Sequence, residues 1–215
     1  MENEYIIIGG GGHALSVANS LLNAKLNLRG YTAPEDQGNL ALGIPWLGTD
    51  DMLARHTSPG LRLINGIGSA GHGMDLRRSA FENLKSREFT FAHLVHPNAS
   101  VSSLDSKYGS GLQVLAGAHV NAGVHCGENV LINTGAIVEH GCRIGSHCHI
   151  ASGAVLCGDV EVGESVHIGA AATVIQGIRI GAGAVIAAGT VVTQNVEPLT
   201  LIAGVPGKVK RKIEQ

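Results

Sequence analysis

The sequence has few aromatic and charged residues and no excess of positive charge. Only 3% of its 215 residues are aromatic and 15% are charged, against an average charged fraction of about 25%. Fifteen basic and seventeen acidic side chains give a formal charge of -2, so no net positive charge attracts nucleic acid or anionic lipid. We therefore predict no nucleic-acid partner.

Long hydrophobic runs are also missing. The apolar run Tyr5 to Ile8 follows the acidic residues Glu2 and Glu4, and it is too short for a signal-peptide core or a membrane span. We expect a cytoplasmic protein without a membrane partner.

Paired cysteine motifs are absent as well. The four cysteines, Cys126, Cys142, Cys148 and Cys157, contain no C-x-x-C pair, which argues against a zinc ribbon or a redox dithiol. We expect free thiols, with Cys157 at the surface and the others as small buried hydrophobes.

Glycine is abundant, at 31 residues, and the chain carries a six-residue repeat. An aliphatic residue or cysteine recurs at Val114, Val120, Cys126, Ile132, Val138, Ile144, Ile150, Leu156, Val162, Ile168, Val174, Ile180, Ile186 and Val192. A small or β-branched residue follows four positions later, at Ala118, Val124, Val130, Ala136, Cys142, Cys148, Ala154, Val160, Val166, Ala172, Ile178, Ala184 and Thr190.

This period predicts a parallel β-helix of hexapeptides. A helical period of 3.6 cannot produce it, whereas a short strand and a turn can, with both repeated positions pointing inward. Glycine stands beside the aliphatic residue at Gly127, Gly145, Gly163, Gly169 and Gly181. Three hexapeptides make one coil, so residues 18 apart stack at about 4.8 Å.

The repeat sets the expected domain boundaries. We predict a β-helix over residues 93–197, with an irregular first coil and a loop around Ser102 to Ser110. The period stops at the turn Gln194 to Pro198, and residues 198–215 are expected to cap the open end of the solenoid.

The first ninety residues predict a small Rossmann-like domain over residues 1–92. Strands are expected at Tyr5–Ile8, near Leu28–Tyr31 and at Leu61–Ile67. Helices are expected at Leu15–Ala24, Asp50–Arg55 and about Met74–Lys85, with a turn around Gly43 to Pro45. This alternation is typical of a parallel sheet with flanking helices.

A glycine-rich loop joins the first strand to the first helix. Gly9-x-Gly11-x-x-Ala14 fits the phosphate-binding pattern, in which backbone amides at a helix N-terminus approach a phosphate. Nucleotide or nucleotide-sugar binding and a purely structural turn are both open. A plain NAD site is disfavoured, because strand two ends in Thr32-Ala33 rather than in an acidic residue.

Six of the eleven histidines lie between His119 and His167. The repeat places His149 and His167, 18 residues apart, on adjacent coils of one outer face, and it places His140 and His147 at or near corners. We interpret His119, His125 and His147 as solvated or interface histidines. A metal cluster of histidines and cysteines is disfavoured because Cys142 and Cys148 point inward, so we predict no metal.

Six motifs together resemble a bacterial family of sugar acetyltransferases, of the sialic acid O-acetyltransferase and nucleotide-aminosugar N-acetyltransferase type. They are IIIGGGGHA at the start, GIPWLGTDD, INGIGS, LVHPNASV, NTGAIVEHGCRIGSHCHIASGA and AGVPGKV. The resemblance spans nearly the whole chain and implies a left-handed β-helix, a homotrimer and acetyl-CoA as co-substrate, bound between neighbouring helices.

The resemblance also implies roles for individual residues. His140 matches the general base, His149 a histidine near the thioester, and Glu139 a group that could orient His140. Matched substrate-binding positions are Gly11, Gly12, His13, Gly68, Ser69 and Asn133. Matched coenzyme-binding positions are His149, Gly158, Ala170, Ala188, Gly189 and Lys208.

The chain departs from the family in two places. The family often has an acidic residue directly after the catalytic histidine, and this chain has Gly141. The acidic pair usual at the end of strand two is replaced by Thr32-Ala33. The first departure leaves open which group orients His140, and the second leaves open how the nucleotide is contacted.

The sequence therefore predicts an acetyl-CoA-dependent N-acetyltransferase acting on a nucleotide-linked 4-amino-4,6-dideoxy sugar. An imidazole can accept a proton as the amine attacks the thioester, so no acyl-enzyme is needed. The alternatives are a sialic acid O-acetyltransferase, a metal-dependent β-helix hydratase with three convergent histidines, and a non-catalytic scaffold.

Overall fold

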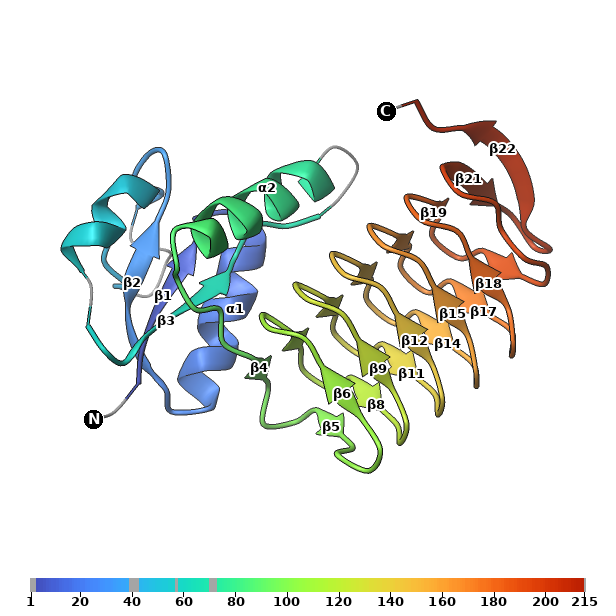
Figure 1. Ribbon diagram of the computed structural model, residues 1–215, viewed down its shortest axis with the longest axis horizontal. Helices are drawn as coiled ribbons and strands as arrows, with labels where there is room; N and C mark the ends of the chain where they lie inside the picture. Colours follow the sequence, from blue (N-terminus) through green and yellow to red (C-terminus); the bar gives the residue numbers. More distant parts are fainter. Residues whose placement is uncertain (1–2, 39–42, 57, 70–72, 215) are drawn as a thin grey trace. The chain divides into compact units, whose positions relative to one another are not determined.

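The structure is a computed structural model that describes residues 3–38, 43–56, 58–69 and 73–214 (Figure 1). The chain divides into two compact units, Met1–Pro97 and Asn98–Gln215, and each is described by itself. The expected turn at Gly43 to Pro45 lies at the edge of the described residues, and Gly43 has a φ of +70°.

The first unit is a parallel three-stranded sheet with helices. Strand order is β2-β1-β3, and both neighbours run parallel to β1. The elements are β1 (Glu4–Ile8), α1 (Gly12–Asn23), β2 (Asn27–Thr32), the 3₁₀ helix η2 (Asp50–Arg55), β3 (Leu61–Asn65), α2 (Gly73–Ser86) and β4 (Leu94–Val95).

Successive residues of β1 face opposite sides of this sheet, as the strand period requires. Ile7 packs in one apolar cluster with Ala14, Val17 and Leu21 of α1. Ile6 and Ile8 pack in a second cluster that includes Leu53 of η2 and Phe81 and Leu84 of α2. The sheet is therefore covered on both faces, which confirms the predicted parallel α/β arrangement.

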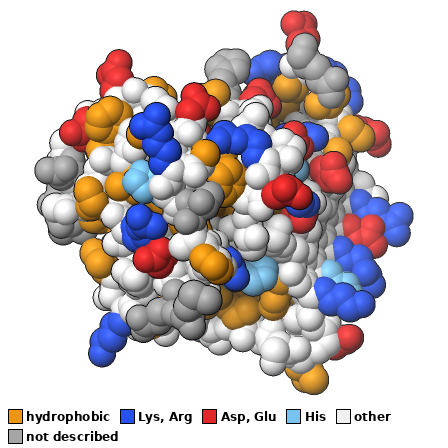
Figure 2. Space-filling view, turned by 60° about the vertical axis from the view of Figure 1, so that its left-hand side comes forward, with side chains coloured by type: hydrophobic (Ala, Val, Ile, Leu, Met, Phe, Trp, Pro, Cys, Tyr) orange, Lys and Arg blue, Asp and Glu red, His pale blue; other side chains and the backbone are white. Residues whose placement is uncertain are grey.

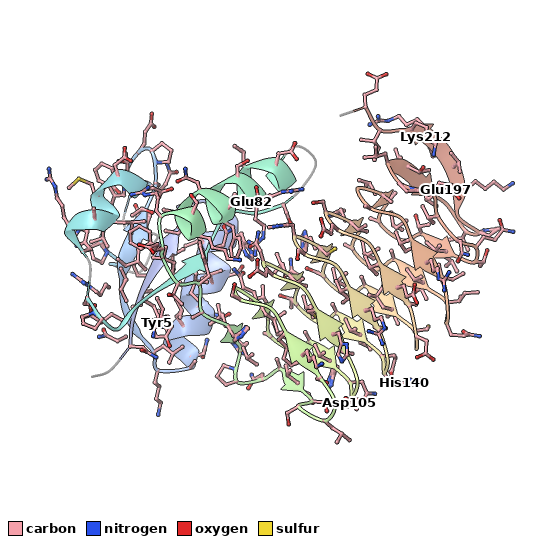
Figure 3. All side chains as sticks on the ribbon, in the orientation of Figure 1. Tyr5, Glu82, Asp105, His140, Glu197 and Lys212 are labelled. Carbon is pink, nitrogen blue, oxygen red and sulfur yellow. The ribbon has the colours of Figure 1, made fainter. Side chains whose placement is uncertain are left out.

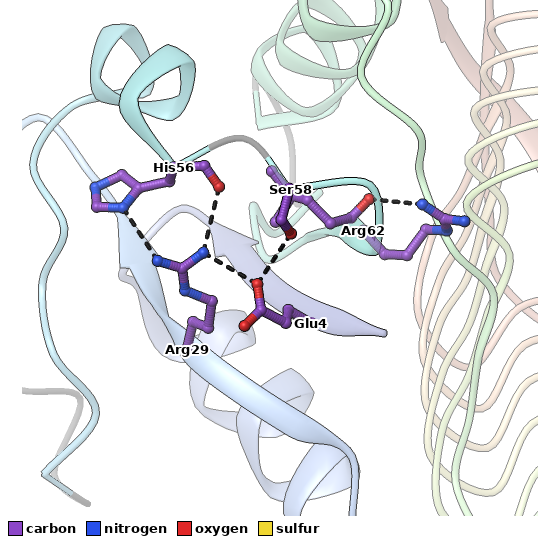
Figure 4. Close-up of polar contacts among 6 residues, drawn as sticks. Glu4, Arg29, His56, Ser58 and Arg62 are labelled. Carbon is purple, nitrogen blue, oxygen red and sulfur yellow. Dashed lines mark hydrogen bonds and ion pairs between the residues drawn. The ribbon is translucent and has the colours of Figure 1, made fainter. Parts of the chain in front are cut away.

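A polar network ties the beginnings of the strands to the segment between η2 and β3 (Figure 4). Arg29 of β2 donates to the Glu4 carboxylate at 3.1 Å and to the carbonyl oxygen of His56 at 3.3 Å. The Ser58 hydroxyl donates to the same Glu4 oxygen at 3.0 Å. Both side chains of the ion pair are about one-third exposed, so it contributes little to stability by itself.

The predicted elements appear with small shifts at their ends. The third strand was expected to reach Ile67, and it ends at Asn65 because the Asn65 side chain turns the backbone. Its Oδ1 accepts a hydrogen bond from the Ile67 amide at 3.1 Å. The first helix begins at Gly12, three residues before the expected start, since Gly11 serves as its N-cap.

The second unit is a solenoid of two-residue strands on three parallel sheets. Sheet B includes β7 (Gln113–Val114), β10 (Leu131–Ile132), β13 (His149–Ile150), β16 (His167–Ile168), β19 (Val185–Ile186) and β21 (Thr200–Ala203). Sheet C holds β5 (Ser100–Val101), β8 (His119–Val120), β11 (Ile137–Val138), β14 (Val155–Leu156), β17 (Thr173–Val174) and β20 (Val191–Val192). Sheet D holds β6 (Lys107–Tyr108), β9 (His125–Cys126), β12 (Arg143–Ile144), β15 (Glu161–Val162) and β18 (Arg179–Ile180).

The repeat predicted from the sequence is confirmed. Paired residues are 18 apart from β7 to β20, as in Leu131 with His149, and all fourteen predicted aliphatic or cysteine positions are buried in one continuous core. Thr190 is also buried. Cys126, Cys142 and Cys148 are buried free thiols and Cys157 is partly exposed, as expected.

Glycine permits the close stacking of coils along sheet D. A Cβ at Gly145 would lie 2.7 Å from the Glu164 backbone nitrogen, and a Cβ at Gly163 would lie 2.6 Å from the Ala182 nitrogen. Real Cβ atoms do not approach backbone atoms so closely. A side chain at either position would therefore force the next coil to shift. The repeated glycines therefore set the spacing between coils.

Both ends of the solenoid deviate from the period. Strand β5 pairs with a residue 19 positions later, as in Ser100 with His119, whereas β6 keeps the spacing of 18. One extra residue is thus inserted between β5 and β6, within the predicted irregular loop. At the other end β22 (Lys208–Lys212) folds back antiparallel on β21, so the terminal segment forms a hairpin.

Candidate active site

His140 lies at the corner between sheets C and D. It occupies the turn between β11 and β12, where Gly141 has a φ of +71°, and its side chain is exposed (Figure 3). The carbonyl oxygen of His140 accepts a hydrogen bond from the Asp159 amide of the next coil at 2.9 Å. The prediction that His140 lies at a corner is therefore confirmed.

The ring of His140 extends over Gly158 on the next coil. A Cβ at residue 158 would lie 2.6 Å from His140 Cε1 and 2.9 Å from Nε2. The ring takes this position because residue 158 has no side chain. Gly158 was predicted to bind the coenzyme, and the structure shows it in contact with the predicted base.

Glu139 is tethered to the preceding coil. Its Oε2 accepts a hydrogen bond from Asn121 Nδ2 at 2.9 Å. The Asn121 side chain is itself fixed, because its Oδ1 accepts from the Ala122 amide at 2.8 Å. One oxygen of Glu139 is therefore bound to Asn121, on the coil that precedes His140.

A second carboxylate, which the sequence motifs do not indicate, lies at the same corner. Asp159 stacks on Gly141, and a Cβ at residue 141 would overlap Asp159 Oδ1 and lie 3.2 Å from its Cγ. The spacing of 18 could have indicated this neighbour. The Asp159 carboxylate thus fills the space that a side chain at residue 141 would need.

The stacked histidines of sheet B are present as predicted. His149 pairs with His167 in register, and the ring centroids lie 4.9 Å apart at an interplanar angle of 74°. Asn133 Nδ2 lies 3.1 Å from His149 Nε2, and Asn133 Oδ1 accepts from the Thr134 amide at 2.8 Å. Because that second bond fixes the amide, Nδ2 is the donor and His149 Nε2 is the acceptor.

The structure also assigns separate roles to the glycines of the N-terminal loop. Gly9 has a φ of +99°, which favours glycine. Gly11 and Gly12 have open space where a side chain would project, and Ala14 is fully buried. The first turn of α1 contains no acidic residue, so its backbone dipole is not neutralised locally.

A second loop lies beside this glycine loop. A Cβ at Gly68 would be 3.6 Å from His13 Cβ, so these two predicted substrate positions are neighbours. Arg77 of α2 donates from Nη1 to the carbonyl oxygens of Asn65 at 3.0 Å and Ile67 at 2.9 Å. Burial lowers the pKa of Arg77 to about 9. This buried guanidinium holds the loop that contains Gly68 and Ser69, and the sequence motifs do not indicate it.

Acidic groups are present near the end of β2, despite Thr32-Ala33 in the sequence. The Thr32 hydroxyl donates to Asp50 Oδ1 at 2.5 Å. The Tyr31 hydroxyl donates to Asp36 Oδ1 at 2.7 Å. Both carboxylates come from segments that follow β2, which explains why the strand itself shows no acidic signature.

A groove of the described solenoid runs along the outer face of sheet D. It has a volume of about 770 Å³ and is crossed by His125, Arg143, Glu161 and Arg179 on successive coils. Arg179 pairs with Glu161 at 3.0 Å, and Arg143 Nη1 lies 3.3 Å from His125 Nδ1. Basic, acidic and histidine side chains gather at the right-hand edge of the view in Figure 2. None of the predicted site residues lines this groove.

Comparisons with known proteins agree with this architecture. The model of the bacterial transferase hexapeptide (six repeats) matches residues 123–158 and 159–194. The acetyltransferase domain of PglB from Neisseria gonorrhoeae FA1090 is 30% identical with a TM-score of 0.90, over 97% of this chain and 100% of that chain. PerB from Caulobacter crescentus, in complex with CoA and GDP-perosamine, is 36% identical with a TM-score of 0.88, over 97% and 98% of the two chains.

The chain belongs to the hexapeptide-repeat acetyltransferases. WeeI from Acinetobacter baumannii AYE, at 19% identity and a TM-score of 0.76, shares the fold. No curated protein sequence matches the chain.

Within one chain, this acetyltransferase does not bring all predicted site residues together. His140, Glu139 and Gly158 share the corner between sheets C and D, whereas His149 lies on the outer face of sheet B. Asn133, Ala170, Ala188 and Gly189 lie in the turns between sheets B and C, and Lys208 begins β22. A full side of the triangular coil, sheet C, separates these turns from His140.

The described part of the acetyltransferase shows two further features. No helix in it is both long and apolar enough to cross a membrane. Across residues 3–38, 43–56, 58–69 and 73–214, no three His, Cys, Asp or Glu side chains are arranged to hold a metal ion. The three convergent histidines that a β-helix hydratase needs are not among these residues.

Proposed function

We propose that this acetyltransferase moves the acetyl group of acetyl-CoA to the amine of a nucleotide-linked 4-amino-4,6-dideoxy sugar. The observation that carries the proposal is the near full-length similarity to PerB, at 36% identity, in a structure with CoA and GDP-perosamine. The PglB acetyltransferase domain, at 30% identity, is in complex with acetyl coenzyme A in a second structure. Two enzymes that share this fold across both units thus point to a CoA thioester as co-substrate, and PerB also points to a nucleotide sugar.

His140 acts as the general base in this proposal. Its exposed imidazole accepts a proton from the sugar amine while the amine nitrogen attacks the thioester carbonyl. The C–N bond forms, the C–S bond breaks, and the proton is passed to the sulfur of the departing CoA. The transfer is direct and needs no acyl-enzyme. Gly158 leaves the space in which the His140 ring lies.

The coenzyme is proposed to lie along the turns between sheets B and C. Ala170, Ala188 and Gly189 are exposed and small, so an extended chain can approach the backbone there. Strand β22 reads KVKRK and all five of its residues are exposed, and its first residue, Lys208, suits a phosphate of CoA. His149 is placed near the thioester, with Nδ1–H as the ring donor because Asn133 occupies Nε2.

The nucleotide sugar is proposed to bind the N-terminal loops. Gly11 and Gly12 present open backbone at the beginning of a 12-residue helix, which suits a diphosphate. His13 and Gly68 lie side by side at that point, and the loop with Ser69 is held by Arg77. Asn133 is assigned to the sugar end of the substrate.

We assign the enzyme to a homotrimer. One chain has the predicted base at the corner between sheets C and D, and the predicted coenzyme positions Ala170, Ala188 and Gly189 at the turns between sheets B and C. A complete site forms when the first corner of one copy meets the second corner of another. Closed rings of identical subunits provide such repeated heterologous contacts.

Turnover on a substrate panel tests the proposal. Acetyl-CoA is supplied with UDP-, GDP- and dTDP-linked 4-amino-4,6-dideoxy sugars and, separately, with sialic acid, and thiol release is followed together with the mass of the product. A gain of one acetyl group on an amino sugar supports the proposal. Acetylation of sialic acid alone would replace it with O-acetyl transfer, and no thiol release with any acceptor would contradict it.

A further inference from the structure

Two carboxylates border His140, and they come from opposite sides of the turn. Glu139 is bound through Oε2 to Asn121 on the preceding coil. Asp159 belongs to the following coil, to which the ring of His140 itself extends. Glu139 thus belongs to the coil of His140 and is bound to the preceding coil, whereas Asp159 belongs to the following coil.

The backbone of Asp159 is bound to the backbone of His140. Its amide donates to the carbonyl oxygen of His140 at 2.9 Å. The residue has a φ of +58°, and its carboxylate bends back over Gly141. The ring of His140 points toward the next coil over Gly158, while the Asp159 side chain points toward the coil of His140. The two side chains thus come from adjacent residue columns of one corner.

We infer that Asp159 is a positioning residue for His140, a role that rests on the proposed function of His140 as base. Its carboxylate restrains the ring on the side of the following coil and stabilises the imidazolium formed when the base accepts a proton. The space for this carboxylate exists because residue 141 is glycine. The carboxylate of residue 159 therefore supplies the charge that no side chain at residue 141 provides.

Other polar groups near this turn come from its own coil and from the two neighbouring coils. The preceding coil contributes the uncharged Asn121, and the partly exposed thiol of Cys157 lies on the following coil. Arg143 is on sheet D, with its Nη1 at 3.3 Å from His125. Among the described groups at this corner, Glu139 and Asp159 are the carboxylates that can respond to a charge on His140.

The first test compares Asp159→Asn with the wild-type enzyme. Exposed ion pairs are worth a few-fold at most, whereas loss of the buried aspartate of a catalytic triad costs about 10⁴-fold. For this exposed corner we expect kcat to fall by roughly tenfold, a value between these limits. The acidic limb of the kcat/KM profile should move to lower pH, because a lost carboxylate makes the imidazolium easier to deprotonate. Glu164→Gln, an exposed carboxylate at another corner of the same coil, serves as the charge control.

A second pair of variants tests the geometry. In Gly141→Ala the new Cβ displaces the Asp159 carboxylate, so this variant should reproduce the pH shift of Asp159→Asn. Gly123→Ala is the matched control, since Gly123 has the same φ of +71° and a Cβ there would be 3.5 Å from the nearest atom. It should bear the same backbone strain and leave the pH profile in place.

A measurement without substrate separates this inference from the proposed reaction. The His140 ring is titrated by NMR in the wild type and in both Asp159→Asn and Glu139→Gln. We expect the curve of His140 to move to lower pH in Asp159→Asn, by more than in Glu139→Gln. An unchanged curve in Asp159→Asn, or the larger shift in Glu139→Gln, would overturn the role of Asp159 even if the enzyme is active. A shift in an enzyme that is inactive on every substrate would uphold the pairing and reject the reaction.

Discussion

The imidazole of His140 lies over the Cα of Gly158 on the following coil, in space that a Cβ would occupy at 2.6 Å from Cε1. The position of the ring is therefore set by the absence of a side chain 18 residues later in the sequence. This relationship links the repeat of the solenoid directly to the proposed chemistry.

Gly158→Ala should displace the ring without disturbing the fold. Gly158 has no positive φ, so alanine is compatible with its backbone, and the displaced ring is exposed and free to turn. We expect kcat to fall by roughly tenfold or more, since a misplaced base transfers protons poorly, with little change in Tm. The double variant His140→Ala/Gly158→Ala should be no slower than His140→Ala, because both changes affect one group. Additive losses would argue against this coupling.

Gly163→Ala should destabilise the solenoid. The new Cβ would meet the backbone of Ala182 at 2.6 Å, and overpacking of this kind costs about 1 to 3 kcal/mol. The control is Gly153→Asn, at a φ of +67° with open space around it, because asparagine tolerates that conformation. Urea unfolding should give a clearly lower midpoint for Gly163→Ala than for Gly153→Asn, and equal midpoints would contradict the stacking argument.

The buried thiols should make the fold sensitive to alkaline pH. Burial raises the pKa of Cys126 and Cys148 to about 12 and that of Cys142 to about 11, from 9. Since the folded pKa lies above the unfolded one, this contribution to stability is complete below pH 9 and is lost as pH rises toward 11 to 12. The urea midpoint should therefore fall above pH 9. Cys148→Ala should show a shallower fall, and an equally steep one would contradict the assignment.

Asn133 should control the protonation pattern of His149. In the native structure the Asn133 amide donates to Nε2, which requires Nδ1 to carry the ring proton. Asn133→Asp replaces the donor with an acceptor, so the proton should move to Nε2, and NMR of the imidazole nitrogens should report this exchange of tautomers. Asn133→Gln keeps an amide on a longer side chain, so it tests whether the position of the amide donor affects the tautomer of His149. An unchanged tautomer in Asn133→Asp would contradict the assignment.

The solenoid follows from the sequence because its period is visible in single residues. Each inward position, such as Val138 or Leu156, repeats at a fixed interval, and the stacking of His149 on His167 follows from their separation of 18. The two-sided core of the first unit is likewise indicated by the apolar strand Tyr5 to Ile8, which leads into the glycine-rich loop.

The residues that the sequence does not indicate depend on side-chain direction or on loop paths. The 18-residue spacing places residue 159 above residue 141. It does not show that the Asp159 carboxylate turns back over Gly141. Arg77 shares the buried face of α2 with Phe81 and Leu84, four and seven residues later, but a pattern of apolar residues does not predict that an arginine is buried among them. Asp50 reaches Thr32 only because the segment after β2 returns to the end of that strand.

Acetyl transfer by His140→Ala, measured beside wild type and His119→Ala, tests the central claim most directly. His119 is also an exposed histidine of the solenoid, so it controls for the loss of an imidazole. The account predicts that kcat on the preferred amino sugar falls by a hundredfold or more in His140→Ala, within the roughly 10² to 10⁴ range for loss of a general base, and stays near wild type in His119→Ala. Undiminished turnover in His140→Ala would contradict it.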